Sequence, residues 1–227
     1  MPTIARDGDV AVLNLGGDEN RFSPDWLESM HACLDEIEGL GSPAALVTVA
    51  EGKFWSNGLD LDWLMSHTDQ GEWYVDTVQR LLSRVLVAPL PTVAAIQGHC
   101  FAAGGMLAMA HDWRVMRADR GFFCLPEVDL NLPFPPGMDA LLRAKLSPAT
   151  AIEAMTTGRR YGGVDALAAG LVTAAVEESA VLPAALDIVR PLTAKASPNL
   201  GVIKSTMFAE AVRMLAVVHR PQSAGPA

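Results

Sequence analysis

The chain has 227 residues, of which half are hydrophobic and 19% are charged. This length is typical of one large domain with a substantial core, and the apolar content excludes intrinsic disorder as a description of the whole chain. The formal net charge of −9, from 26 acidic and 17 basic residues, argues against binding of nucleic acid or anionic membranes through the overall field.

Three cysteines, Cys33, Cys100 and Cys124, are widely spaced, and the sequence has no CxxC pair. We therefore expect no zinc site and no disulfide framework, but three buried free thiols in a reducing compartment. The N-terminus lacks a basic segment followed by an apolar one, and no apolar run reaches the length of about 18 residues that spans a bilayer. We expect a cytoplasmic protein without a metal.

Short strand patterns alternate with amphipathic helical patterns in the first half of the chain. Ser23 and Pro24 are typical of an N-cap and first helical turn, and an apolar stripe at spacings of three and four follows them. A continuous apolar run, as at 46–50, is typical of a strand buried on both faces. The predicted elements are a strand at 10–15, a helix at 24–40, a strand at 46–50, a helix at 75–86 and a strand at 92–96.

The second half is mostly helical. We predict helices starting at Ser147-Pro148 and at 164–169, a short strand at 171–173, and helices at 181–194 and 198–218, with a frayed tail at 219–227. Strands that alternate with helices of this length favour an α/β fold with a largely parallel core. We predict a core spanning residues 1–195 and a helical C-terminal extension at 196–227 with a disordered tail.

Several well-known cofactor and nucleophile motifs are absent from the sequence. It has no P-loop, no GxGxxG after a strand and no GxSxG, so it carries no sign of an NTPase, a dinucleotide enzyme or a serine hydrolase of those classes. His111 has no second histidine near it, and we interpret it as a packed core residue.

Two glycine-containing turns follow predicted strands. In the first, Gly58 permits a sharp turn and Asp60 suits the N-cap of a following helix, which leaves a backbone N–H near residue 59 pointing into a cleft. In the second, small residues from Gly98 to Gly105 crowd the point where a strand leads into a helix, and unpaired N–H donors gather there. Each turn alone is more typical of tight packing. Two such turns at the ends of neighbouring strands would supply a pair of N–H groups, which is what an oxyanion hole requires.

A third segment, at 121–133, places two acids among apolar neighbours. Glu127 follows a proline, and Asp129 lies two residues further on. Desolvation raises the pKa of a carboxyl group, and a glutamate tuned to about 6–7 is a competent base near neutral pH. The alternative is a surface glutamate in a loop, which this segment alone favours.

In this order, the three segments resemble the crotonase (enoyl-CoA hydratase/isomerase) superfamily over about residues 10–194. The stretch from Gly98 through Gly121, followed by Pro126, Glu127, Val128 and Asp129, is most similar to the plant-type Δ3,Δ2-enoyl-CoA isomerases. The resemblance implies an α/β fold built as a spiral of ββα units with a helical C-terminal part. It also implies an acyl-CoA substrate, no cofactor beyond that coenzyme A, and a homo-oligomer, either a trimer or a hexamer.

The resemblance also assigns roles to single residues. It places the two oxyanion-hole N–H groups on Leu59 and Ala103, with Gly104 as the alternative to Ala103, and the catalytic glutamate on Glu127. For the acyl pocket we predict Phe123, Met106, Leu132 and Phe134, although core packing explains each of them equally well. Lys53 is the nearest cation for the phosphates of coenzyme A, and a solvated loop lysine is the alternative.

One departure from the family pattern discriminates between reactions. Hydratases of this superfamily use two carboxylates to orient a water, and the position of the second acid is Met106 here. Related dienoyl-CoA isomerases place acids at Met106 and Pro135, and both are missing. One glutamate suffices for a proton shift from C2 to C4, so we predict a 3-enoyl-CoA to 2-enoyl-CoA isomerase. The alternatives are a hydratase that recruits Asp129 or Asp139, and a protein that binds acyl-CoA without turnover.

Overall fold

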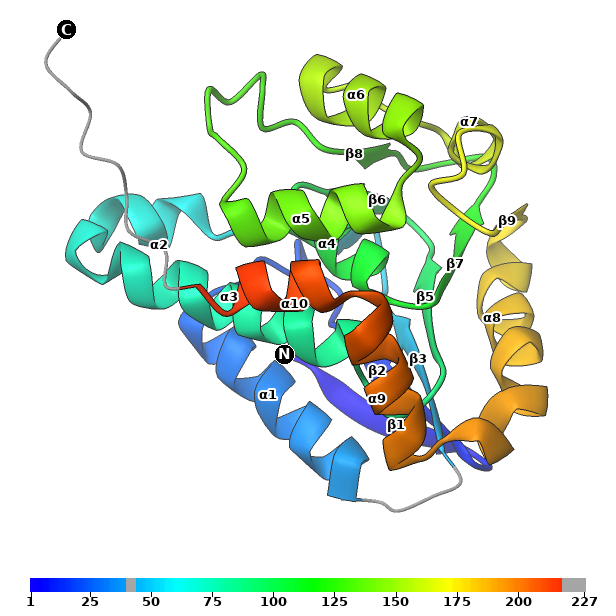
Figure 1. The fold of residues 1–227 in the computed structure, drawn as a ribbon. Coiled ribbons are helices and arrows are strands. Elements are labelled where there is room, and N and C mark those ends of the chain that lie inside the picture. Colours follow the sequence, from blue (N-terminus) through cyan, green and yellow to red (C-terminus); the bar gives the residue numbers. More distant parts are fainter. Residues whose placement is uncertain (40–43, 218–227) are drawn as a thin grey trace, which may run out of the picture.

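A six-stranded sheet runs through the centre of the computed structural model, which describes residues 1–39 and 44–217 (Figure 1). β1 pairs with β2 in antiparallel orientation, and every other neighbouring pair in this main sheet is parallel. The largely parallel core predicted from the sequence is therefore confirmed. In spatial order the strands are β1 (Thr3–Asp7), β2 (Val10–Asn14), β3 (Ala45–Val49), β5 (Thr92–Ile96), β7 (Trp113–Arg117) and β9 (Ala174–Val176).

A second, smaller sheet consists of three short parallel strands, β4 (Phe54–Ser56), β6 (His99–Phe101) and β8 (Phe123–Cys124). Each of them follows a strand of the main sheet along the chain, because β4 comes after β3, β6 after β5 and β8 after β7. The carboxyl ends of parallel strands meet at one edge of a sheet. The segments that follow β4, β6 and β8 are therefore brought to the same edge of the small sheet.

Helices cover both faces of the main sheet. Inward-facing residues of its strands alternate between two clusters: Leu46 and Ala94 face the larger one, whereas Val47 and Val93 face a smaller one that packs against α8. This alternation explains the continuous apolar runs, because both faces of each strand are buried. The helices are α1 (Pro24–Gly39), α2 (Leu61–Ser66), α3 (Gly71–Leu86), α4 (Ala103–Ala110), α5 (Pro136–Lys145), α6 (Pro148–Thr157), α7 (Gly163–Ala168), α8 (Val181–Val189), α9 (Pro198–Met207) and α10 (Ala209–Leu215), with 3-10 turns at Thr68–Gln70, Glu178–Ala180 and Arg190–Lys195.

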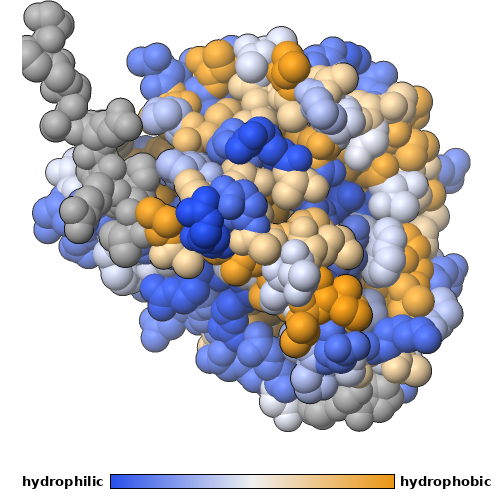
Figure 2. Space-filling view, viewed as in Figure 1, coloured by the Kyte–Doolittle hydropathy of each residue, from blue (hydrophilic) through white to orange (hydrophobic). Residues whose placement is uncertain are grey.

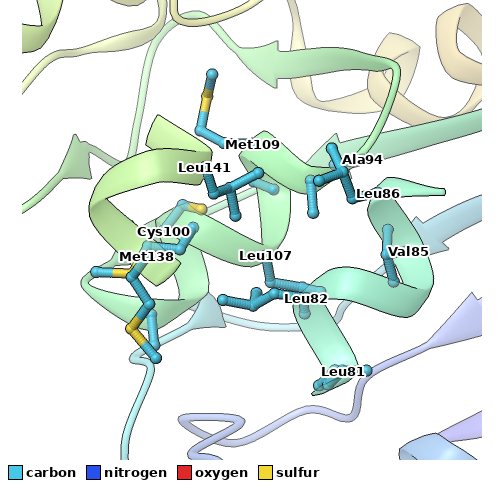
Figure 3. Packing of buried hydrophobic residues seen from close by; sticks show 14 of the residues in the cluster. Leu81, Leu82, Val85, Leu86, Ala94, Cys100, Leu107, Met109, Met138 and Leu141 are labelled. Atoms are coloured by element: carbon cyan, nitrogen blue, oxygen red, sulfur yellow. The ribbon is translucent and has the colours of Figure 1, made fainter. Parts of the chain in front are cut away.

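The short helix α4 lies inside the molecule, and all eight of its residues are buried. Figure 3 shows its Leu107 and Met109 packed among Leu82 of α3 and Leu141 of α5. A helix that is apolar all round has no solvent-facing side, so packing from every direction holds its N-terminus in place.

Most predicted elements exist, but several bounds are wrong. The strand predicted at 171–173 lies three residues later, at β9, because the N–H groups of Leu171 and Val172 bond back to Ala166 and end α7. The predicted helix at 75–86 starts at Gly71, the one at 181–194 ends its α-helical part at Val189, and the one at 198–218 is two helices. No prediction was made for β1, β4, β6, β7, β8 or α5. The start of α2 was predicted from its N-cap Asp60, but no end was given.

The helices after residue 195 pack on the core. α10 lies on α5 and α3, and a Cβ added to Gly137 of α5 would come within 2.8 Å of the Leu215 Cα atom. α9 carries three exposed apolar side chains, Val202, Ile203 and Met207, in a region where Figure 2 shows hydrophobic surface. The predicted tail at 219–227 is outside the described residues.

All three thiols are free, as predicted; Cys100 and Cys124 are buried, but Cys33 is half-buried on α1 and not fully buried as we expected. Within residues 1–39 and 44–217, no helix combines the length and hydropathy needed to cross a bilayer.

Candidate active site

The turns that follow β4 and β6 touch each other through their main chains. We call residues 56–60 the first turn and residues 101–104 the second turn. A Cβ added to Gly58 would lie 2.7 Å from the Ala103 nitrogen, closer than Cβ atoms approach other atoms in proteins, and 3.1 Å from the Gly104 nitrogen. Gly58 also has a φ of +79°, which favours glycine. This glycine therefore allows the two turns to approach each other.

Backbone N–H groups gather where the turns meet. In the part of the chain that the structure describes, the N–H groups of Leu59, Ala103 and Gly104 have no hydrogen-bond acceptor. Ala103 and Gly104 open α4, and the first N–H groups of a helix have no partner within the helix. The predicted donor positions are thus free to bind an oxygen atom, and Gly104 remains an alternative to Ala103.

Side chains of the turn itself, together with Tyr74 of α3, hold the first turn in place. The Ser56 hydroxyl accepts a hydrogen bond from the Gly58 N–H (3.1 Å) and donates one to the Asn20 carbonyl (2.9 Å). The Asp60 N–H donates to the hydroxyl of Tyr74 (2.8 Å), and the Asp60 carboxylate accepts from the Trp63 N–H as the N-cap of α2, as predicted. Leu59 therefore lies between Gly58 and Asp60, whose N–H groups are both hydrogen-bonded to hydroxyl groups.

The second turn is fastened by main chain. Ala102 has a φ of +50°, a region that costs a non-glycine residue about 1–3 kcal/mol. Its N–H donates to the Cys124 carbonyl of β8 (3.0 Å), and its carbonyl accepts from the Met106 N–H (3.1 Å). The strained residue directly precedes the predicted donor Ala103, and these bonds together with the buried α4 keep it in place.

Glu127 lies three residues after β8, at the same edge of the small sheet as the two turns. Its side chain is buried, with 6% of the residue exposed, and its Oε2 atom has no hydrogen-bond partner among the described residues. Burial raises the pKa of Glu127 to about 7, and a hydrogen bond from its own backbone amide acts in the opposite direction with a smaller effect. A carboxyl group in this state can accept and release a proton near neutral pH.

The predicted acyl-pocket residues differ in their surroundings. Met106 and Phe123 are buried in the cluster that contains Ala103, and Leu59 and Phe134 pack against that cluster. Leu132, in contrast, is 42% exposed and lies outside the cluster. Of the four predicted acyl-pocket residues, Met106, Phe123 and Phe134 thus belong to or pack against this large core cluster, and Leu132 lies at the surface. Met106 places a thioether three residues after Ala103.

Lys53 lies at the other end of the small sheet. It precedes β4, whereas Leu59 follows it, and its ammonium group is 5.1 Å from the centre of the Phe54 ring. Lys53 lines a surface pocket of about 310 Å³ together with Gly52, Gln97, Gly98, His99, Arg117, Arg120 and Glu178. The structure therefore does not bring Lys53 together with Leu59, Ala103 and Glu127. Arg117 and Arg120 could not be recognised from the sequence, because nothing in their local pattern separates them from surface residues.

The other polar candidates are accounted for by local contacts. Asp139 pairs with Arg143 (2.9 Å), and Asp129 is exposed. His111 is fully buried; its Nε2 lies 2.8 Å from the Thr48 hydroxyl and its Nδ1 2.9 Å from the Leu107 carbonyl, so it is a packed core residue as predicted. Among the described residues, no three His, Cys, Asp or Glu side chains group in a way that could hold a metal ion.

Comparisons with known proteins agree with the sequence resemblance. Residues 7–221 match the family described as Enoyl-CoA hydratase/isomerase. The chain is 34% identical over 226 residues to Enoyl-CoA delta isomerase 3 of Arabidopsis thaliana, with 95% of each chain covered, and 29% identical over 216 residues to a probable enoyl-CoA hydratase of Bacillus subtilis, with 92% of this chain and 83% of the relative covered. The crystal structure of human mitochondrial delta3-delta2-enoyl-CoA isomerase superposes with a TM-score of 0.85 at 23% identity, covering 95% of this chain and 90% of that one, which shows the shared fold.

Proposed function

This chain belongs to the enoyl-CoA hydratase/isomerase family, and on that premise we propose that it is an enoyl-CoA isomerase that converts a 3-enoyl-CoA to the conjugated 2-enoyl-CoA. The observation that carries the proposal is the buried carboxyl group of Glu127, whose pKa is raised to about 7 and whose Oε2 atom has no partner among the described residues. Such a group is suited to taking a proton from carbon and returning it.

In the proposed mechanism, the thioester oxygen accepts hydrogen bonds from the Leu59 and Ala103 N–H groups. The Glu127 carboxylate removes a proton from C2, and the electron pair of that C–H bond moves into a dienolate whose negative charge rests on the thioester oxygen. Protonated Glu127 then delivers the same proton to C4, and the double bond moves from C3–C4 to C2–C3. Donors aimed at the developing oxyanion supply most of the stabilisation, about 3–4 kcal/mol for each donor.

Met106 favours isomerisation over hydration. A hydratase has to orient a water between two carboxylates, and the buried thioether of Met106 occupies the position where the family's second acid stands. A thioether is at most a weak acceptor and adds apolar surface, which excludes water from the dienolate. Two other acids were considered for a hydratase. Asp129 is exposed, and Asp139 is paired with Arg143.

The raised pKa of Glu127 predicts a pH dependence. The base has to be ionised to take the C2 proton, so kcat/KM is expected to rise with pH through about 7 and to level off above it. A profile that is flat from pH 5 to 8 contradicts Glu127 as the base.

Turnover assays separate the isomerase from its alternatives. The protein is incubated with a 3-enoyl-CoA, and the absorbance of the conjugated thioester is followed for wild type, Glu127→Gln and Glu210→Gln, an exposed glutamate paired with Arg213 on α10. We expect Glu127→Gln to lose activity by a factor on the order of 10³ or more and the control to retain it. Water addition to a 2-enoyl-CoA at a comparable rate identifies a hydratase, and binding of acyl-CoA with neither reaction identifies a non-catalytic protein.

Further assignments belong to the same proposal. The pocket for the acyl chain is lined by Met106, Phe123, Leu132 and Phe134. Lys53, at the far end of the small sheet, contacts a phosphate of coenzyme A. The protein works in the cytoplasm as a trimer or hexamer. The three exposed apolar residues of α9 offer a surface for assembly, and light scattering measures the mass in solution.

A further inference from the structure

Tyr74 of α3 has a fully buried side chain whose hydroxyl joins two separate segments of the chain. It accepts a hydrogen bond from the Asp60 N–H in the first turn, and it donates one to the Phe22 carbonyl, each at 2.8 Å. Both capacities of the hydroxyl are therefore used by main-chain groups. Tyr74 lies 14 residues from Asp60 and 52 residues from Phe22, so the fold alone brings them together.

The Phe22 segment holds the peptide unit that presents the Leu59 N–H group. The Phe22 N–H donates to the Gly58 carbonyl (2.8 Å), and that carbonyl belongs to the same planar peptide as the Leu59 nitrogen. In a trans peptide the C=O and N–H bonds point in opposite directions, so fixing the carbonyl also fixes the direction of the N–H. A hydrogen bond to the carbonyl also polarises the peptide and strengthens its N–H as a donor.

Tyr74 thus constrains Leu59 from both sides. On one side it holds the Asp60 N–H, which belongs to the next peptide unit; on the other it holds Phe22, whose N–H binds the preceding unit. Loss of the hydroxyl leaves one part-buried N–H and one buried carbonyl without their partner. Such groups cost about 1–3 kcal/mol each when unsatisfied, so both peptides would turn to find new partners.

We infer that Tyr74 is a positioning residue for the oxyanion hole, which aims the Leu59 N–H at the thioester oxygen without touching the substrate. The inference rests on the proposed isomerisation through an enolate. Its specific consequence is that Tyr74 matters more for the anionic intermediate than for the neutral substrate, because hydrogen bonds to an oxyanion are stronger and more sensitive to geometry than those to a carbonyl.

The chain offers a matched control. Its two tyrosines are Tyr74 and Tyr161; the second is also fully buried, and its hydroxyl donates to the Glu153 carboxylate of α6 (2.9 Å) and to neither turn. Tyr74→Phe and Tyr161→Phe each delete one hydrogen-bonded hydroxyl from a buried ring. A general loss of stability would affect both variants, whereas a loss of oxyanion geometry would affect Tyr74→Phe alone.

The first readout is kinetic. We expect Tyr74→Phe to lower kcat by about 10-fold, less than the 10²–10³-fold cost of deleting a donor, with KM changed by less than about 2-fold, and Tyr161→Phe to stay within about 2-fold of wild type. Equal effects in the two variants, or a rise in KM without loss of kcat, overturn the inference. An inactive wild-type protein would instead refute the proposed function.

The second readout is binding. Acetoacetyl-CoA ionises to an enolate whose negative charge is shared between the ketone and thioester oxygens, whereas the acyl group of butyryl-CoA remains neutral. Tyr74→Phe is expected to weaken binding of the enolate, followed by its absorbance, by about 10-fold and to leave butyryl-CoA affinity unchanged. Equal weakening of both ligands, or of neither, contradicts the positioning role.

A third measurement keeps the hydroxyl and does not depend on the folding of Tyr74→Phe. Incorporation of 3-fluorotyrosine into Tyr161→Phe labels position 74 alone. We expect its ¹⁹F resonance to shift when acetoacetyl-CoA binds and to move much less with butyryl-CoA. The reason is that the enolate oxygen accepts a stronger hydrogen bond from the Leu59 N–H, whose neighbouring peptide groups are bound to Tyr74 and Phe22. A resonance that responds equally to both ligands, or to neither, overturns the inference.

Discussion

The two turns that present the oxyanion donors reach similar roles by different means. In the first turn the residue with positive φ is Gly58, and the turn's own Ser56 side chain and the distant Tyr74 side chain hold the main chain. In the second turn the residue with positive φ is Ala102, and the bonds that hold it run between main-chain groups. The first turn therefore depends on hydroxyl groups, whereas the second depends on β8 and on the packing of α4.

The largest effect is expected where the two turns touch. Gly58→Ala places a Cβ 2.7 Å from the Ala103 nitrogen and 3.0 Å from the Phe101 carbonyl oxygen, so the two turns have to separate. Displacing a donor to this extent is expected to lower kcat by about 10²–10³-fold. Steady-state kinetics with a 3-enoyl-CoA measure the loss.

Gly170→Ala is the matched control for that variant. Gly170 has a φ of +74°, close to that of Gly58, but a Cβ there meets nothing within 4 Å. We expect it to share the backbone strain, about 1–2 kcal/mol of lost stability, and to keep its activity. If Gly58→Ala behaves like Gly170→Ala, the close approach of the two turns is not what the reaction needs.

An intermediate effect tests whether water is excluded near the two turns. The pKa of Glu127 is raised by burial from 4.5 to about 7, so the folded state disfavours its ionised form. The stabilising contribution of this group is complete below pH 4.5 and is lost as pH rises through about 7. Glu127→Gln is therefore expected to raise the free energy of unfolding by roughly 2–3 kcal/mol at pH 8 and by almost nothing at pH 4.

Denaturant unfolding at the two pH values measures this difference, with Glu210→Gln as the exposed control. If Glu127→Gln raises the free energy of unfolding equally at pH 4 and pH 8, the Glu127 carboxyl group is hydrated in the folded protein and its pKa is not raised by burial.

The smallest effect sharpens the comparison at the second turn. Ala102→Gly removes the steric cost of φ +50° but adds chain entropy, so a net gain of about 1 kcal/mol is expected, with turnover within about 2-fold of wild type. Ala108→Gly, inside the buried α4, is expected to lose about 1 kcal/mol or more, because glycine weakens a helix interior. Thermal denaturation of the two variants checks the opposite signs. A destabilised Ala102→Gly would show that the positive φ carries no strain.

Local patterns predicted the elements that their own residues specify. The Thr92–Ile96 strand and the N-caps Ser147 and Asp60 lie where expected, because burial on both faces and capping act within a few residues. The segment around Glu127 favoured a surface glutamate when taken alone, and only the family resemblance assigned it the catalytic role, although its neighbours 123–125 are apolar and buried. The two- and three-residue strands of the small sheet escaped prediction because strands this short carry no periodicity.

The sequence by itself determined which chemistry is available: one glutamate in apolar surroundings, a methionine in place of a second acid, and two turns of small residues. Only the tertiary structure decided how these parts are aimed. Tyr74 looks like one more apolar position of an amphipathic helix until its hydroxyl is found between Asp60 and Phe22. Lys53 is only a few residues from the first turn in the sequence, but the three-residue strand β4 separates them, so Lys53 lies at the opposite end of the small sheet. A sequence pattern specifies local geometry, and the direction of an N–H group depends on contacts between segments that are far apart along the chain.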